Sequence, residues 1–435
     1  MRTIGLVLNN VDVKQLARSD SDLAEFYNSY AADVAQERRG HRSLARTLGE
    51  RAMKVAIVHE WLETYAGSER VLEQMIRCFP DADLFAVVDF LSRQERVFLQ
   101  GRDVRTSFVQ KLPFARRHFR SYLPLMTVAV EQFDLSGYDM VLSSSHAVAK
   151  GVLTGPNQVH VSYVHSPMRY AWDQQAQYLR QAGLNKGFKT ICAKVILHQM
   201  RMWDVRTANG VDQFVANSSF IAARIRKVYR RNAVVLHPPV DTDAFCVANS
   251  RDGVYVVAAR FVPYKRVDLV VEAFRQMPDR PLRVIGTGPE LVRIRQAVRG
   301  APNIELFDPL PKTDLIATLQ NARAFVFAGE EDFGITLVEA QACGTPVIAY
   351  GSGGAVDIVR GGVTGVLFRE QTPAAIVDAV NRFEAMEGEI TPRNCRVNAE
   401  RFSASNFRRG LMDTVEAAMG SNHTRQRDMP ELSLA

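Results

Sequence analysis

Short apolar segments alternate with longer amphipathic segments over much of the chain. The apolar segments of the first half lie at residues 55–58, 84–88, 140–142, 159–164, 213–216 and 234–236. Each has the length of a strand that is buried on both faces, and the segments between them have the helical period. Such alternation predicts βαβ units and a parallel sheet.

The alternation stops once and then restarts. Pro238 and Pro239 interrupt it, a polar stretch runs to Asp252, and further apolar segments follow at residues 254–259, 282–285, 304–307, 324–327 and 347–349. We therefore predict an α/β protein of two Rossmann-like, doubly wound domains that face each other across a cleft. Ligands of open parallel sheets bind beyond the carboxyl ends of the strands, so the cleft is the expected site.

The predicted domain boundaries follow from these breaks. Residues 1–52 are rich in Arg, Asp, Glu, Ser and Ala and lack an apolar strand. We expect them to form an N-terminal extension that is disordered or not native, and that is dispensable. The first domain is predicted at residues 53–238 and the second at residues 239–400. Residues 401–435 are expected to form a crossing helix, roughly Phe402 to Met419, and a tail.

Composition limits the class of protein. The chain is 47% hydrophobic and 23% charged, as in soluble globular proteins, and no stretch approaches the ~18 apolar residues of a membrane span. No apolar secretory segment opens the chain, so we expect a cytoplasmic protein. The five cysteines include no Cys-x-x-Cys pair, which argues against disulfides and structural zinc. A net charge of +7 favours an anionic partner.

Two acids, Glu331 and Glu339, flank a Phe-Gly turn directly after the apolar segment Ala324 to Ala328. The second acid falls on a helix predicted from about Gly334 to Gly344. A strand, a turn and a helix N-terminus favour anion binding, because the first N–H groups of a helix are unpaired and its dipole is positive there. Taken alone, Glu339 could instead stabilise its own helix dipole, and Glu331 could be a solvated loop acid.

Two cations, Arg260 and Lys265, follow the segment Val254 to Ala259 in the same predicted domain. A guanidinium can bind two phosphate oxygens at once and an ammonium is a mobile point charge, which suits a diphosphate leaving group. A solvated pair of loop charges is the alternative. The acidic motif that follows about 70 residues later in the same domain favours the diphosphate.

The order Arg260-x4-Lys265 and then Glu331-x7-Glu339 resembles the retaining, nucleotide-sugar-dependent glycosyltransferases of family 4. The resemblance extends from Met53 to about residue 420. It implies the GT-B fold, in which two Rossmann-like domains enclose the active site and a C-terminal helix crosses back to the first domain. It also implies a retaining hexosyltransferase with an acceptor-binding first domain, a nucleotide-sugar-binding second domain, and no cofactor apart from the nucleotide-sugar co-substrate.

The resemblance assigns roles to individual residues. It implies that Glu331 is a catalytic residue that binds hydroxyls of the transferred sugar, and that Glu339 binds the nucleotide ribose. Phe333 and Gly334 would contact the donor sugar. The donor diphosphate would be bound by Arg260, Lys265, Gly67, Ile335, Thr336 and Leu337. Physical chemistry agrees, since carboxylates are strong acceptors for vicinal hydroxyls and helix N-terminal amides favour phosphate oxygens.

In the first domain, the loop before the first predicted helix contains Gly67, whose backbone could approach the diphosphate. Family members often have two adjacent glycines at this place, so Ala66 is a departure from their pattern. A simple helix-capping turn, with Ser68 as the cap, is the alternative.

His165 ends the segment Val159 to Val164 and opens the polar run His-Ser-Pro-Met-Arg-Tyr-Ala-Trp-Asp. The resemblance implies that this histidine is a catalytic residue that contacts the donor sugar near its reacting centre. Arg169, Trp172 and Asp173 are candidate contacts of the acceptor or the donor, with core packing as the alternative for Trp172.

Two further motifs narrow the resemblance. His59-Glu60-Trp61-Leu62 and His237-Pro238-Pro239-Val240-Asp241 are similar to segments of bacterial O-antigen and exopolysaccharide mannosyltransferases. They imply GDP-mannose as the donor and a lipid-linked saccharide as the acceptor, in polysaccharide synthesis. Two other functions stay open: a sugar-nucleotide epimerase of the same fold, and a catalytically silent nucleotide-binding partner of a synthase complex.

The stretch Arg105 to Met126 contains five cations and no acid, interleaved with apolar residues. We predict a basic amphipathic helix that binds an anionic membrane surface, at the inner face of the cell membrane. A nucleic-acid patch and a solvated helix face are the alternatives. Because no nucleic-acid-binding motif accompanies the stretch, no nucleic-acid partner is predicted.

No metal site is predicted. Asp81 with Asp83, and Asp241 with Asp243, have the Asp-x-Asp spacing that metal-dependent transferases use, but we interpret both pairs as turn residues. The segment Gly286-Thr-Gly288-Pro289 resembles half of a dinucleotide fingerprint. Without the third glycine it predicts a turn near the nucleotide and no NAD site.

Overall fold

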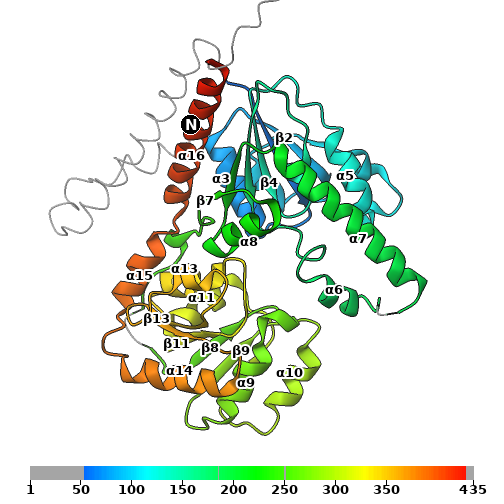
Figure 1. Ribbon diagram of the computed structural model, residues 1–435. Coiled ribbons are helices and arrows are strands. Elements are labelled where there is room, and N and C mark those ends of the chain that lie inside the picture. Colours follow the sequence, from blue (N-terminus) through cyan, green and yellow to red (C-terminus); the bar gives the residue numbers. More distant parts are fainter. Residues whose placement is uncertain (1–52, 185, 249–250, 428–435) are drawn as a thin grey trace, which may run out of the picture. The chain divides into compact units, whose positions relative to one another are not determined.

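The computed structural model describes residues 53–184, 186–248 and 251–427 (Figure 1). The predicted extension, residues 1–52, and the end of the predicted tail, residues 428–435, lie outside the described residues. That the extension is dispensable therefore stays a prediction. The described chain folds around two parallel sheets, and Figure 1 shows helices on both faces of each sheet.

The first sheet has seven parallel strands in the order β3-β2-β1-β4-β5-β6-β7. The strands are β1 (Val55–Leu62), β2 (Asp83–Asp89), β3 (Val104–Thr106), β4 (Met140–Ser145), β5 (Val159–Val164), β6 (Gln213–Ala216) and β7 (Ala233–Val235). Its longer helices are α3 (Gly67–Cys78), α5 (Leu123–Glu131), α6 (Gln175–Gln181), α7 (Phe188–Thr207) and α8 (Ser219–Tyr229). The order of strands reverses between β1 and β4, and such a switch point opens a crevice at the carboxyl edge of a parallel sheet.

The second sheet has six parallel strands in the order β10-β9-β8-β11-β12-β13. The strands are β8 (Tyr255–Ala258), β9 (Leu282–Ile285), β10 (Ile304–Phe307), β11 (Ala324–Phe327), β12 (Val347–Tyr350) and β13 (Gly365–Phe368). The helices of this part are α9 (Val267–Arg275), α10 (Leu291–Val298), α11 (Lys312–Asn321), α12 (Ile335–Ala342), α13 (Ala355–Ile358), α14 (Pro373–Ala385) and α15 (Pro392–Glu400). Here the order reverses between β8 and β11.

The strands are short and largely buried because helices cover both faces of each sheet. Every residue of β4, β5, β8 and β11 is buried, which explains why most of these segments appear as continuous apolar runs. Polar residues inside β4 and β5 are hydrogen-bonded instead of exposed: Ser143 Oγ, for example, donates to Ser162 Oγ at 2.9 Å. The prediction of two doubly wound α/β domains is confirmed.

The last helix, α16 (Ala404–Arg427), returns to the first sheet as predicted. Arg408 Nη1 donates to Gln74 Oε1 on α3 at 2.7 Å, and the Phe407 ring lies edge-on to Tyr163 of β5 with centroids 5.7 Å apart. These contacts attach the C-terminal element to the first domain. The helix begins at Ala404, two residues later than predicted, and is longer than predicted.

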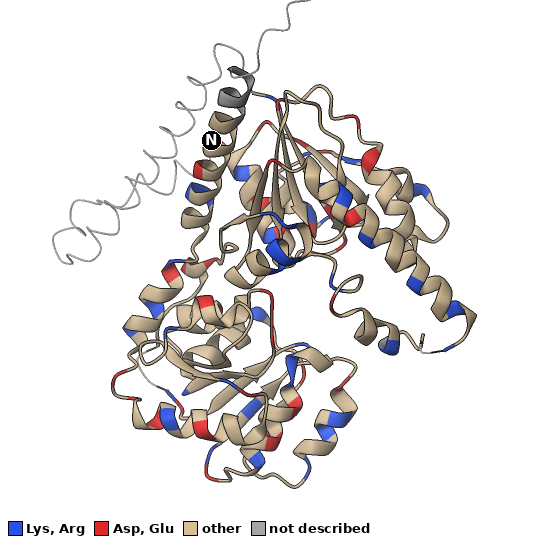
Figure 2. Ribbon diagram, in the orientation of Figure 1, with Lys and Arg blue, Asp and Glu red and all other residues tan. Residues whose placement is uncertain are grey.

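The single basic amphipathic helix predicted over Arg105 to Met126 is wrong. Strand β3, a 3₁₀ turn (Phe108–Lys111), the one-turn helix α4 (Ala115–His118), a second 3₁₀ turn (Phe119–Tyr122) and the start of α5 share the stretch. Pro113 and the left-handed Phe114, at φ 55°, break any continuous helix. The basic side chains are nevertheless exposed, and Figure 2 shows that basic positions occur on helices of both sheets.

Candidate functional site

A pocket of about 580 Å³ lies at the carboxyl ends of β8 and β9, and its volume suits a small ligand. Its lining comprises Ala258, Ala259, Arg260, Ile285, Gly286, Thr287, Gly288, Pro309, Leu310, Leu315 and Thr336. A Cβ on Gly286 would lie 2.0 Å from the Ala259 carbonyl oxygen, so only glycine lets the two strand ends meet so closely. The predicted diphosphate contacts Arg260 and Thr336 thus face the same pocket.

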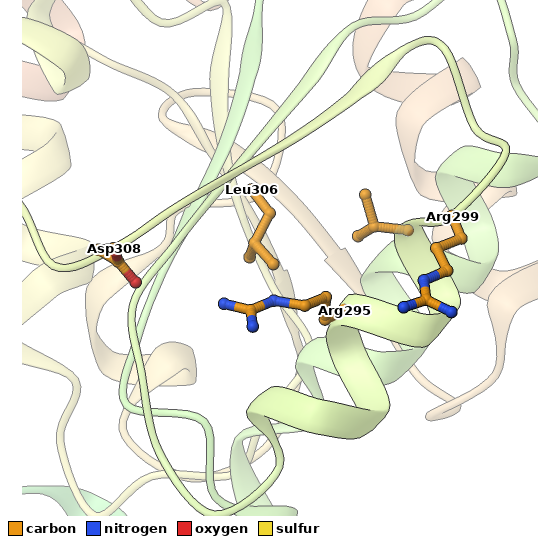
Figure 3. A pocket seen from close by; sticks show the side chains of 5 residues that line it. Arg295, Arg299, Leu306 and Asp308 are labelled. Atoms are coloured by element: carbon orange, nitrogen blue, oxygen red, sulfur yellow. The ribbon is translucent and has the colours of Figure 1, made fainter.

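A second pocket, of about 340 Å³, lies between α10 and β10 and contains none of the predicted site residues. It is lined by Arg295, Val298, Arg299, Leu306 and Asp308. Figure 3 shows Arg295 extending past Leu306 towards the side of Asp308, while the Arg299 guanidinium turns away. Because a carboxylate shares this pocket with the two guanidinium groups, it has no clear preference for an anion.

The two charged motifs meet at the loop between β11 and α12. Lys265 Nζ forms an ion pair with Glu331 Oε1, and both side chains are mostly buried. A backbone hydrogen bond holds this loop in place, since Gly354 N donates to the Glu331 carbonyl at 2.8 Å. A Cβ on Gly353, which has φ +67°, would lie 2.2 Å from that carbonyl oxygen, so this position requires glycine. A cation that follows β8 and the carboxylate that follows β11 are therefore in direct contact.

Helix α12 begins directly after this loop, at Ile335, with Gly334 as its N-cap. No side chain caps it, so its first amides lack a side-chain acceptor. Leu337 N donates to the Gly334 carbonyl at 3.0 Å, whereas no hydrogen bond is formed by the amides of Ile335 and Thr336 with the described residues. Phe333 is buried and stacks on His237, with ring centroids 5.5 Å apart, so its ring is a structural support.

Glu339, the predicted ribose ligand, bonds to Arg70 of the first domain. Arg70 Nη1 lies 3.0 Å from Glu339 Oε1, and the two residues are 269 positions apart in the chain. The predicted loop glycine is close by, since a Cβ on Gly67 would lie 3.2 Å from Ile335 Cδ1. No local pattern marked Arg70, which contacts a predicted site residue only in the folded chain.

The alternative in which Ser68 caps the first helix is wrong. Helix α3 begins at Gly67, so Ser68 lies inside it, and the N-cap is Ala66. Glu69 Oε2 accepts from Ala66 N at 3.0 Å, which is the bond that the acid of a capping box makes to the N-cap backbone. The Ala66 side chain itself caps no amide of the helix.

His165 follows β5 and is half-buried. Its Nε2 lies 2.9 Å from Ser144 Oγ, and desolvation by burial lowers the pKa of His165 to about 3, with His146 and His59 adding to the effect. The imidazole is therefore neutral near pH 7. Asn217 Nδ2 donates to the His165 carbonyl at 2.9 Å, which ties the end of β5 to the end of β6.

The predicted contacts after His165 have different surroundings. Arg169 Nη2 bonds to Asp332 Oδ2 at 3.0 Å, and burial raises the pKa of Asp332. Trp172 Nε1 donates to the buried Asp204 at 2.8 Å, which favours the core-packing interpretation of Trp172. Asp173 forms an ion pair with Arg224. Asp332 had no signal in the sequence beyond its place next to Glu331.

The turn after β4 shows a structural role for Glu60 of the motif His59-Glu60-Trp61-Leu62. Glu60 is fully buried, and its carboxylate accepts from the backbone N–H groups of residues 146–149 at 2.7–3.0 Å. Although burial opposes ionisation, these hydrogen bonds and His146 keep the pKa of Glu60 below its usual value. Glu60 therefore shapes the crevice at β4.

In the part of the chain that the structure describes, no group of three or more His, Cys, Asp or Glu residues could hold a metal ion. Cys192, Cys246, Cys343 and Cys395 are free thiols. None of the helices that the structure describes is long and apolar enough to cross a bilayer.

Residues 65–244 match the family model "Glycosyltransferase Family 4", and residues 243–402 match "Glycosyl transferases group 1". D-inositol 3-phosphate glycosyltransferase of Mycobacterium leprae (strain TN) is 29% identical over 250 residues, which cover 51% of this chain and 58% of that protein. The same enzyme of Mycobacterium tuberculosis (strain F11) is 29% identical over 246 residues, covering 50% and 51%. The chain thus spans less than two thirds of the length of these relatives.

Solved structures share the fold. Sucrose-phosphate synthase from Thermosynechococcus elongatus has a TM-score of 0.64 and 17% identity, over 85% of this chain and 100% of that chain. Anabaena HepE in complex with UDP-glucose has a TM-score of 0.61 and 16% identity, over 84% and 100%. At these identities, the similarity concerns the two-domain architecture alone.

Proposed function

We propose that the chain transfers a sugar from a nucleotide sugar to an acceptor hydroxyl, with retention of configuration, since its two halves match the models "Glycosyltransferase Family 4" and "Glycosyl transferases group 1" and its fold is GT-B. One observation carries the proposal. Lys265 and Glu331 are in contact, and Arg260 and Thr336, which come from the same two βα connections, line a pocket of about 580 Å³. A cation for a departing diphosphate thus adjoins a carboxylate that can bind sugar hydroxyls.

The roles of the groups follow from where charge develops. Negative charge accumulates on the diphosphate as its bond to the sugar breaks, and Arg260, Lys265 and the first amides of α12 stabilise it. The acceptor hydroxyl attacks from the same face, and its proton passes to the departing phosphate. Glu331 orients the sugar, and the neutral His165 contacts it from the first domain. Closure of the domains excludes water, which would otherwise hydrolyse the donor.

For the donor and acceptor we propose GDP-mannose and a lipid-linked saccharide of bacterial polysaccharide synthesis. The support is the similarity of His59-Glu60-Trp61-Leu62 and His237-Pro238-Pro239-Val240-Asp241 to segments of mannosyltransferases. The name of the mycobacterial relatives favours a second acceptor class, an inositol phosphate. Both acceptors carry phosphate, which agrees with the net charge of +7.

We also propose that the enzyme works at the inner face of the membrane. Arg116 and Arg117 are exposed on the short helix α4, next to Phe114, whose side chain is 78% exposed. Exposed cations beside an exposed aromatic ring suit an anionic lipid surface.

The test is incubation of the purified protein with GDP-mannose or UDP-glucose and with each acceptor class. A glycosylated acceptor supports the proposal, and the identity of the consumed donor and acceptor decides the finer choice. An altered free sugar without acceptor would instead indicate an epimerase. Binding of a donor without turnover would indicate the silent partner of a complex.

A further inference from the structure

Four side chains form a chain of hydrogen bonds inside the first domain. Glu69 Oε1 lies 3.4 Å from His59 Nε2, and His59 Nδ1 lies 3.0 Å from Ser144 Oγ. Ser144 Oγ in turn lies 2.9 Å from His165 Nε2. The first three residues are at most 4% exposed, so solvent water is excluded from this path. This row of hydrogen bonds leads from the start of α3 through β1 and β4 to the carboxyl end of β5.

The donors and acceptors among these four side chains determine the direction of each hydrogen bond. Burial opposes ionisation of Glu69, but the hydrogen bond from His59 and the nearby amides keep its pKa below the usual value, so this carboxylate only accepts. His59 must then carry its proton on Nε2. The 3.4 Å separation is longer than the ~2.7–2.9 Å of a charge-assisted bond, so the contact between Glu69 and His59 has the geometry of a weaker hydrogen bond.

With its one proton on Nε2, His59 has a bare Nδ1 that accepts from the single proton of Ser144. The Ser144 oxygen can then only accept from His165, whose proton must lie on Nε2. His165 Nδ1 is left bare, and no hydrogen bond joins it to any residue within the described ranges. The half-buried imidazole therefore presents a lone pair at the carboxyl edge of the sheet.

We infer that Glu69, His59 and Ser144 are positioning residues that fix His165 as the Nε2–H tautomer, so that its Nδ1 accepts a hydrogen bond from one hydroxyl of the donor sugar. This inference rests on the proposed function, since a sugar must bind beside His165. It also has a consequence for specificity. A donor that lacks this hydroxyl, or carries a substituent on it, leaves the nitrogen unpaired and binds less well.

The sheet provides a matched control for Ser144. Its neighbour Ser143 is equally buried and also bonds to a histidine, His160 Nε2, at 2.8 Å, but on the opposite face of β4. Each serine bonds to two side chains, Ser143 to His160 and Ser162, and Ser144 to His59 and His165, so Ser143→Ala and Ser144→Ala each remove two hydrogen bonds and their effects on stability should be similar. Only Ser144→Ala should affect His165.

The experiment measures the tautomer directly. Protein labelled with ¹⁵N-histidine is studied by two-bond ¹H–¹⁵N NMR near pH 7, with the His165 signals assigned from His165→Gln. We expect the Nε2–H tautomer in the wild type and in Ser143→Ala, and a mixture of tautomers in Ser144→Ala. Ser144→Thr keeps the hydroxyl and should restore the wild-type spectrum. An Nδ1–H tautomer in the wild type, or equal spectra for the two alanine variants, would overturn the inference.

A kinetic arm tests the specificity. Deoxy derivatives of the accepted donor sugar are compared, and one of them should lose about tenfold in kcat/KM with the wild type. Ser144→Ala should reduce that discrimination, whereas Ser143→Ala should keep it. Equal discrimination by all three proteins would count against the inference. The NMR measurement needs no donor, so it tests the positioning of His165 by itself. A wrong proposed function would affect only the kinetic measurement.

Discussion

Donor binding should compete with the contact between Arg70 and Glu339. In the structure, the carboxylate proposed to bind the ribose is already bonded to Arg70 at 3.0 Å. A donor that uses both Glu339 oxygens must break this bond, so its loss is subtracted from the binding free energy. We therefore predict that Arg70→Gln binds the donor more tightly than the wild type.

The size of the effect follows from the exposure of the pair. The side chains of Arg70 and Glu339 are 30% and 13% exposed, which places the pair near the weak end of ion pairs, at about 0.5–1 kcal/mol. That free energy corresponds to about two- to fivefold in the dissociation constant. Arg77→Gln is the control, because Arg77 lies on the same helix and bonds to Glu73 at 2.7 Å, away from the site.

The assay is isothermal titration of the donor into the three proteins at low salt. Tighter binding by Arg70→Gln alone is the expected result. Weaker binding by Arg70→Gln would refute the reasoning, because it would mean that Arg70 moves onto the donor diphosphate when the ligand arrives.

Three further predictions concern the diphosphate, the membrane and pH. Lys265→Met should lower kcat about 10²–10³-fold, because a cation at the leaving group acts chiefly in the transition state; an unchanged kcat would contradict this role. Charge reversal at Arg116 and Arg117 should weaken co-sedimentation with anionic vesicles but not with neutral ones, and unchanged co-sedimentation would refute the membrane proposal. The pKa of His165 is about 3 when folded and about 6.5 when unfolded, so the unfolded state binds more protons between these values and stability decreases as the pH is lowered. Urea unfolding should show that His165 accounts for about 2 kcal/mol of the loss between pH 7 and pH 5, which His165→Gln should remove.

The sequence predicted the fold because helices cover both faces of each sheet. Buried strands then appear as apolar runs, and their positions can be read from the chain. The same logic placed Lys265 near Glu331, since β8 and β11 are adjacent and the carboxyl ends of parallel strands meet at one edge.

Contacts across the domains could not be predicted from local patterns. Arg70 meets Glu339, and Arg169 meets Asp332, only because distant strand ends come together in space. The prediction of one helix over Arg105 to Met126 was wrong for another reason. Val109, Phe119 and Met126 are each buried, but separate turns bring them to the core, so their spacing resembles a helix that does not form.

Glu331 is the residue on which the account depends most. Its neighbour Glu330 is a matched control, because it is an exposed acid that bonds to Ser352. The decisive measurement is transfer of a labelled sugar from the nucleotide sugar to an acceptor by the wild type, Glu331→Ala and Glu330→Ala, with the anomeric configuration read by NMR. We predict retention by the wild type and Glu330→Ala, and a loss of at least about 10²-fold in transfer for Glu331→Ala. Equal transfer by the two variants, or an inverted product, would contradict the account.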